Sequence, residues 1–127
     1  MDFSNTLMDA LGMKVITLNA NLVEIQMPVN ENTKQPMGLL HGGASVALAE
    51  TAASIGAFLS IDSRQQQIVG IEINANHVKS KQDGFVIGRA TPIHKGRTTM
   101  VWEIKIVDEQ DRLISISRCT VGIIHTD

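Results

Sequence analysis

The stretch from Gly43 to about Leu59 constrains the fold more than any other part of the chain. It is rich in alanine and leucine and contains no proline, and its length of about 17 residues predicts a helix of roughly 25 Å. Apolar side chains lie nearly all round this helix, at Ala44, Val46, Ala47, Leu48, Ala49, Ala52, Ala53, Ile55, Ala57 and Phe58. A helix of this kind must be covered on several sides, so we expect it at the centre of the molecule.

Strand patterns make up most of the remaining chain. Residues 13–18 and 22–27 are expected to form two strands before the helix, with a short helix at residues 5–12 ahead of them. Four strand segments follow the helix, at residues 67–78, 84–94, 98–107 and 112–124. Because no helices separate these strands, the sheet is expected to be mainly antiparallel. The order predicts an α+β fold in which a curved sheet wraps around the central helix, and a second subunit could supply the rest of the cover.

Alternation within two of the later strands predicts which side chains share a face. In the strand at residues 98–107, the residues expected to face one way are Met100, Trp102, Ile104 and Ile106. In the strand at residues 67–78, those expected on one side are Val69, Ile71, Ile73 and Ala75.

Length and charge bound the class of protein. The 127 residues suffice for one hydrophobic core, so residues 1–127 are expected to form a single domain. A formal net charge of −2 provides no basic excess for nucleic acid or an anionic membrane surface. Cys119 is the one cysteine, so no intrachain disulfide can form, and no secretory signal pattern is present. We expect a cytoplasmic protein without a membrane span.

Two glycines at the start of the expected helix indicate a site for an anion or an oxyanion. The N–H groups of Gly42, Gly43 and Ala44 are expected to lack partners within the helix and to lie at the positive end of its dipole. Glycine leaves no side chain to block a ligand, so the developing oxyanion of a thioester or ester could bind there. The alternative is that the Gly-Gly pair only allows a tight turn into the helix.

Glu50 is a carboxylate within the same apolar helix. The residues one turn away, at positions 46, 47, 53 and 54, supply no cation, and burial would make the carboxylate a stronger base. Ser54 could hydrogen-bond to it, to water or to a substrate. The alternative places Glu50 at a wet subunit boundary or beside a distant arginine.

His41 and Gln35 add two polar side chains just before the helix, although each alone could be a packing or solvated residue. Together with the glycines and Glu50, they are the parts that acyl transfer needs.

These residues resemble a known family, the hotdog-fold acyl-CoA thioesterases. The similarity lies in TKQPMGLLHGGASVALAE at residues 33–50, in VGIEINANHVKS at residues 69–80, and in PIHKG followed by VWEIKIVDEQDRL. The branch concerned includes phenylacetate-pathway and 4-hydroxybenzoyl-CoA thioesterases, and the chain looks most like the 1,4-dihydroxy-2-naphthoyl-CoA hydrolases of menaquinone biosynthesis. The resemblance extends from Val15 to Ile124, and it includes the spacing of Gln35, His41, Glu50 and Ser54.

The resemblance implies a five- or six-stranded antiparallel sheet around the long helix, a dimer with active sites across its interface, and association of dimers into a tetramer. It implies that Glu50 is the catalytic carboxylate, acting as nucleophile or as general base on water. The Gly42 N–H would polarise the thioester carbonyl, while Gln35 and His41 orient the thioester. Ser54, from the same subunit as Glu50, would help to place water. No metal or organic cofactor is implied, because CoA is part of the substrate.

The resemblance also implies two regions that contact the CoA nucleotide. They comprise His77, Lys79 and Ser80 in one place and His94, Lys95, Gly96 and Arg97 in another. Each cation could equally be a solvated strand end, and Lys79 stands where similar enzymes often carry arginine, which alone makes a bidentate phosphate contact.

The sequence leaves the acyl group open, because small changes in an apolar pocket shift preference by only about 1–3 kcal/mol. A broad medium-chain or phenylacetyl-type thioesterase is one alternative. Less favoured are a hotdog acyl-thioester dehydratase, which needs a different acid–base pair, and a non-catalytic acyl-CoA sensor.

Overall fold

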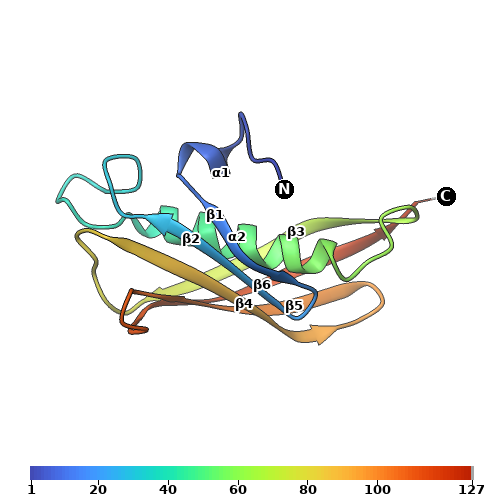
Figure 1. The fold of residues 1–127 in the computed structure, drawn as a ribbon. Helices are drawn as coiled ribbons and strands as arrows, with labels where there is room; N and C mark the ends of the chain where they lie inside the picture. Colours follow the sequence, from blue (N-terminus) through green and yellow to red (C-terminus); the bar gives the residue numbers. More distant parts are fainter. Residues whose placement is uncertain (127) are drawn as a thin grey trace.

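One long helix lies across a single curved sheet in the computed structural model, which describes residues 1–126 (Figure 1). The helices are α1 (Leu7–Ala10) and α2 (Gly42–Phe58). The strands are β1 (Lys14–Asn19), β2 (Leu22–Pro28), β3 (Gln66–His77), β4 (Phe85–Lys95), β5 (Thr99–Val107) and β6 (Leu113–His125). They form one six-stranded sheet in the order β1-β2-β4-β5-β6-β3, with every neighbouring pair antiparallel. The α+β architecture with a central helix is confirmed.

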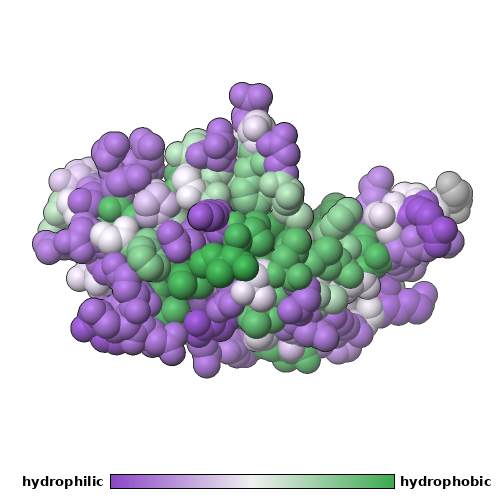
Figure 2. Space-filling view, in the orientation of Figure 1, coloured by the Kyte–Doolittle hydropathy of each residue, from purple (hydrophilic) through white to green (hydrophobic). Residues whose placement is uncertain are grey.

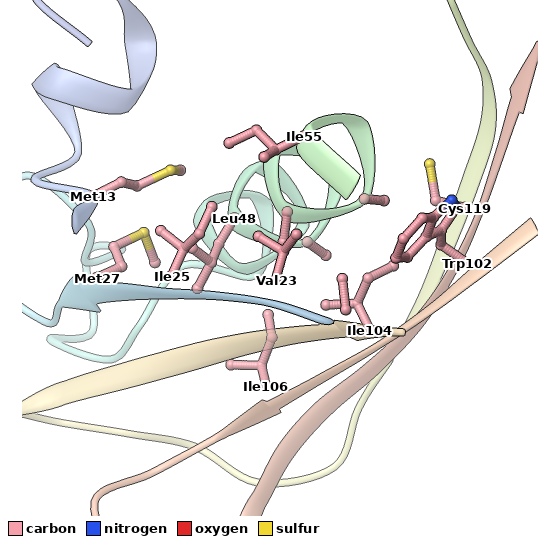
Figure 3. Close-up of a cluster of buried hydrophobic side chains, with 14 of the residues drawn as sticks. Met13, Val23, Ile25, Met27, Leu48, Ile55, Trp102, Ile104, Ile106 and Cys119 are labelled. Atoms are coloured by element: carbon pink, nitrogen blue, oxygen red, sulfur yellow. The ribbon is translucent and has the colours of Figure 1, made fainter. Parts of the chain in front are cut away.

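The hydrophobic core lies between α2 and the concave face of the sheet (Figure 3). The four side chains of β5 that were expected to share a face are all buried there: Met100, Trp102, Ile104 and Ile106. Close approach of the helix requires small residues. A Cβ at Gly88 of β4 would stand 2.9 Å from Cγ of Leu48, so this glycine makes room for the leucine.

The prediction that Val69, Ile71, Ile73 and Ala75 share one face of β3 is wrong for the first two residues. Gly70 pairs with Val121 and Glu72 pairs with Thr120, so a β-bulge between them adds a residue to β3 and reverses the alternation. Val69 and Ile71 are therefore on the outer face, where they are 43% and 59% exposed, whereas the half-buried Ile73 and Ala75 face the helix. The sequence gives no sign of this bulge, because Val69, Ile71, Ile73 and Ala75 continue the apolar alternation through it.

The strand β3 is also one of the two edges of the sheet, and at 12 residues it is twice as long as β1 at the other edge. A long edge strand with exposed apolar side chains is a place where another chain can pair. Among residues 1–126, no helix combines the length and the apolar character needed to cross a membrane.

The contact between Gly56 and Trp102 gives a direct test of this packing. A Cβ at Gly56 would lie 2.7 and 2.9 Å from Cζ3 and Cζ2 of the fully buried indole, and closer still to Cη2. Alanine is otherwise about 1 kcal/mol better than glycine inside a helix. We nevertheless expect Gly56→Ala to lower the free energy of unfolding by about 1–3 kcal/mol, because a rigid ring cannot move aside.

Chemical denaturation measures this change, with Thr51→Ala as the control. Thr51 is also on α2, but it lies on the side of the helix away from the sheet. Its replacement should therefore change the free energy of unfolding by less than about 0.5 kcal/mol. Equal stability of the Gly56→Ala variant and the wild type would contradict the close packing.

Candidate active site

His41 caps the N-terminus of α2 with both its backbone and its ring. Its carbonyl oxygen accepts hydrogen bonds from the N–H groups of Ala44 and Ser45, at 3.0 and 3.2 Å. Its Nδ1 accepts from the N–H of Gly43 at 2.7 Å. Because Nδ1 is an acceptor, the neutral imidazole must carry its proton on Nε2.

These contacts correct the expectation that three N–H groups at the helix start are free. Those of Gly43 and Ala44 are used by His41, and within residues 1–126 only the N–H of Gly42 among the three has no acceptor. The helix itself begins at Gly42, one residue earlier than expected. A single backbone donor at the positive end of the helix dipole is therefore open to a ligand.

Gln35 has its side-chain amide oriented by its own loop. Its Oε1 accepts from the N–H of Met37 at 2.6 Å and from that of Leu39 at 3.4 Å, and its backbone N–H donates to the Leu39 carbonyl. The amide oxygen is thus occupied within the loop. The NH₂ group remains as a donor, which is the property that binding a carbonyl oxygen requires.

Gln35 and Gly42 share a polar pocket of about 390 Å³ with the end of β3. The imidazole of His77 forms one wall of it and lies against Gly42, with Nε2 3.0 Å from the position of a Cβ there. Lys79 and Ser80 lie in the same pocket. One half of the expected site, comprising the carbonyl donors and the first group of CoA contacts, is therefore assembled within one chain.

Glu50 lies in a different depression on the other side of α2. This groove has a volume of about 670 Å³ and includes Ser54 as well as Glu50. Its apolar lining comprises Met1, Leu7, Met8, Val46, Ala47, Ile55 and Phe58. Figure 2 shows hydrophobic residues gathered over the region of α2 beside the N-terminal segment. The groove therefore offers a carboxylate and a hydroxyl on an otherwise apolar surface.

The expectation that the apolar helix buries Glu50 is not met within one chain. Glu50 is exposed, and its Oε2 lies 2.8 Å from the position of a Cβ at Gly70 of β3. The sequence pattern misled because the apolar residues of α2 cover the sheet on one side only. The remaining apolar residues form the open groove, so only a further layer could bury the carboxylate.

Glu50 and Gly42 are also too far apart to act on one carbonyl group. They are separated by eight residues of helix, which corresponds to about 12 Å along its axis. The structure brings Gln35, His41 and Gly42 together, and it brings Glu50 and Ser54 together, but it does not join the two groups in one chain.

The second group of expected CoA contacts lies at the other end of the sheet. His94, Lys95, Gly96 and Arg97 are at the hairpin between β4 and β5. Backbone pairing connects Lys95 through Met100 and Val121 to Gly70 of β3. His77 is seven residues further along β3, or about 23 Å. One chain therefore does not bring the two groups to the same nucleotide.

Lys95 differs from its expected role in another way. Its ammonium group donates to the carbonyl of Ala20 and to Oδ1 of Asn21, both at 2.8 Å, and lies 5.7 Å from the centre of the Trp102 ring. These contacts hold the β1–β2 turn against β4. The charge is thus already engaged within the chain.

Cys119 is no competitor as a nucleophile. The side chain is buried on β6, and burial, followed by the nearby charges of Glu50 and Glu72, raises the pKa of the thiol to about 11. The thiolate is therefore scarce at neutral pH. Within residues 1–126, no group of three histidine, cysteine, aspartate or glutamate side chains is placed to hold a metal ion.

Sequence reasoning assigned no role to the N-terminal segment, which forms a wall of the apolar groove. Met1, Leu7 and Met8 all line it. The short helix α1 was expected, but nothing in its sequence indicates that it turns back over α2. Ser45, which is 2% exposed, likewise lines the polar pocket although it had been counted among no functional residues.

Comparisons with known proteins show the family to which the chain belongs. The model of the thioesterase superfamily matches residues 37–115. A 1,4-dihydroxy-2-naphthoyl-CoA hydrolase of Listeria monocytogenes is 48% identical over 117 residues, which cover 92% of this chain and 94% of the relative. A crystal structure of a Haemophilus influenzae thioesterase is 42% identical with a TM-score of 0.92, covering 96% of this chain and 85% of that one.

A third similar protein, from Staphylococcus aureus, is 44% identical with a TM-score of 0.91, covering 94% of this chain and 98% of that one. It was crystallised in one variant with a glutamate replaced by alanine and in another, named a thioesterase, with a glutamine replaced by alanine. The two altered residues are fifteen positions apart, the separation of Gln35 and Glu50 here. The family match, the identities and the six-stranded sheet around α2 agree: the chain belongs to the thioesterase superfamily and has the hotdog fold.

Proposed function

We propose that this protein hydrolyses acyl-CoA thioesters to a carboxylic acid and free CoA. The observation that carries the proposal is the N–H of Gly42 at the start of α2, which has no acceptor among residues 1–126 and lines the same pocket as Gln35. Two such donors can hold the carbonyl oxygen of a thioester and stabilise the negative charge that develops on it. Preorganised donors of this kind are each worth a factor of about 10²–10³ in kcat.

Glu50 supplies the carboxylate that either attacks the thioester or activates a water molecule. Either its carboxylate attacks the carbonyl carbon and forms an anhydride, or it takes a proton from a water molecule that attacks instead. Ser54 is one turn along the helix from Glu50 and lines the same groove, and it is proposed to hold that water. In support, the glutamate altered in the Staphylococcus aureus relative follows the altered glutamine at the same interval as Glu50 follows Gln35.

A second copy of the chain is proposed to complete the site. In one chain Glu50 lies about 12 Å along the helix from Gly42, and it faces an open apolar groove. Symmetric pairing would place the Glu50 carboxylate of each copy at the carbonyl donors of the other, so that the dimer has two equivalent sites. The long exposed edge of β3 and the open groove favour this interface. Dimers are proposed to associate further into tetramers, as the family resemblance implies.

The acyl group is proposed to be aromatic, with 1,4-dihydroxy-2-naphthoyl-CoA as the first candidate. The Listeria relative that carries this substrate in its name is 48% identical over nearly the whole chain. The groove beside Glu50 is apolar, as an aromatic ring requires, and its volume of about 670 Å³ also admits a medium acyl chain. A broad-range thioesterase therefore remains the alternative.

Replacing Glu50 tests the proposed chemistry. We expect Glu50→Gln to lower kcat by at least about 10²-fold, because the amide can neither attack nor accept a proton. Release of CoA thiol from a panel of aromatic and aliphatic acyl-CoAs measures it, and the ranking of kcat/KM separates the naphthoyl substrate from the alternatives. Glu72→Gln is the matched control, since Glu72 is an exposed glutamate of β3 that accepts a hydrogen bond from the side-chain amide of Asn74. Near-native turnover in the Glu50 variant would refute the mechanism.

Mixing two inactive variants tests the shared site. Gln35→Ala and Glu50→Ala, unfolded and refolded together, should form mixed dimers in which one of the two sites has both wild-type groups. With random assortment, activity should return to about one quarter of the wild-type value. If each chain had a complete site, the mixture would show no more activity than the two variants measured separately.

The cap made by His41 gives a third test. Asparagine caps helices well and alanine does not, so His41→Ala should lose about 1 kcal/mol of stability while His41→Asn keeps most of it. Denaturation and kcat are measured on both variants. If His41→Asn keeps both kcat and stability, the role of His41 is to hold the Gly42 N–H in position. A low kcat in a stable His41→Asn variant would instead indicate direct contact with the thioester.

A further inference from the structure

The imidazole of His77 presents its Nε2 edge to the start of α2. A Cβ at Gly42 would lie 3.0 Å from Nε2, and 3.3 and 3.4 Å from the ring carbons Cε1 and Cδ2 on either side of it. His77 is the last residue of β3 and pairs with Ser115 of β6, so the sheet fixes the base of the side chain. The ring is therefore held against the residue that offers the free N–H.

No hydrogen-bond partner for Nε2 of His77 exists among residues 1–126. The ring lines the polar pocket together with Gln35 and Gly42, and Lys79 and Ser80 extend the same pocket away from the helix. A nitrogen that is unpaired, solvent-accessible and beside the carbonyl donors is free to meet a substrate atom.

An oxygen held by the Gly42 N–H keeps the carbonyl carbon, and with it both the sulfur and the acyl group, close to Gly42. The remaining lining of the pocket decides which of the two faces His77. The CoA arm follows the sulfur, and the cationic and hydroxyl groups at Lys79 and Ser80 suit its polar end. The acyl group then points away from His77, toward the apolar groove of the second copy.

We propose that His77 is a catalytic acid that gives a proton to the departing sulfur of CoA, an inference that rests on the proposed thioesterase function. As the tetrahedral intermediate collapses, the C–S bond breaks and its electron pair passes to sulfur. The proton on Nε2 moves to that sulfur, which leaves CoA as the thiol and the imidazole neutral. Water then returns a proton to the ring for the next turnover. In the general-base route, Glu50 also releases the proton taken from the attacking water.

The chemistry favours such a transfer. An imidazolium ion has a pKa roughly two below that of an alkyl thiol, so the proton moves downhill to the thiolate. General acid catalysis of this kind contributes about 10²–10⁴-fold to a rate. This role differs from contact with the CoA nucleotide, which was the role that the family resemblance implied for His77.

Three thioesters of the same acyl group separate these roles. The first carries CoA, the second N-acetylcysteamine, which is an alkyl thiol without a nucleotide, and the third 4-nitrothiophenol, whose thiolate leaves without a proton. His77→Gln keeps the size and a hydrogen-bond donor but cannot transfer a proton. We expect kcat/KM to fall by about 10²–10⁴-fold for both alkyl thioesters and by less than about threefold for the aryl thioester.

Other results would overturn the inference. A loss confined to the CoA substrate would assign His77 to nucleotide binding, and an equal loss on all three would assign it to oxyanion binding or to structure. No loss on any substrate would remove it from the reaction. His125→Gln is the control, because His125 is exposed at the far end of β6, where it pairs with Gln66. His77→Ala provides a second variant at this position. Thermal unfolding checks the fold of each variant.

The failure of the proposed function would look different. If the wild-type protein hydrolysed none of the three thioesters, the thioesterase proposal itself would fall. If the wild type were active and His77→Gln did not show the leaving-group pattern, only the role of His77 would fall.

Discussion

The packing of α2 into the curve of the sheet determines where every candidate functional group lies. Small residues set the distance between the two layers, with Gly56 against the Trp102 ring and Gly88 beneath Leu48. The same packing brings Gly42 against His77 and Glu50 against Gly70, so both ends of the first nine residues of α2 are fixed relative to β3. Because protein interiors are closely packed, a small displacement of the helix would move all of these groups together.

The N–H groups at the start of α2 are mostly paired, which distinguishes this helix from an ordinary one. Every helix begins with unpaired N–H groups, but here the ring and the carbonyl of His41 occupy those of Gly43, Ala44 and Ser45. Among residues 1–126, the N–H of Gly42 is left without an acceptor, and Gly42 lines the same pocket as Gln35, whose amide oxygen is held by its own loop. Both groups are proposed to hold one thioester carbonyl, without a charged side chain.

The sequence was sufficient for the architecture. Helix α2 is long and apolar, and β5 alternates from Thr99 to Ile106, so their patterns are read correctly from local periodicity. The bulge in β3 and the exposure of Glu50 could not be read in this way. The first is a backbone irregularity through which the apolar alternation of the sequence continues, and the second depends on which apolar residues the sheet covers. The contacts of Lys95 are set by tertiary packing. The cap made by His41 is local, but histidine is not among the usual capping residues, so the sequence did not indicate it.

The most direct measurement of the central claim is a crystal structure with a non-hydrolysable acyl-CoA analogue, in which a methylene group replaces the thioester sulfur. The account predicts that the ketone oxygen accepts hydrogen bonds from the Gly42 N–H and the Gln35 amide of one chain. It predicts that the nearest carboxylate to the carbonyl carbon is Glu50 of a second copy. A ketone bound elsewhere, or a Glu50 that approaches it from the same chain, would contradict the account.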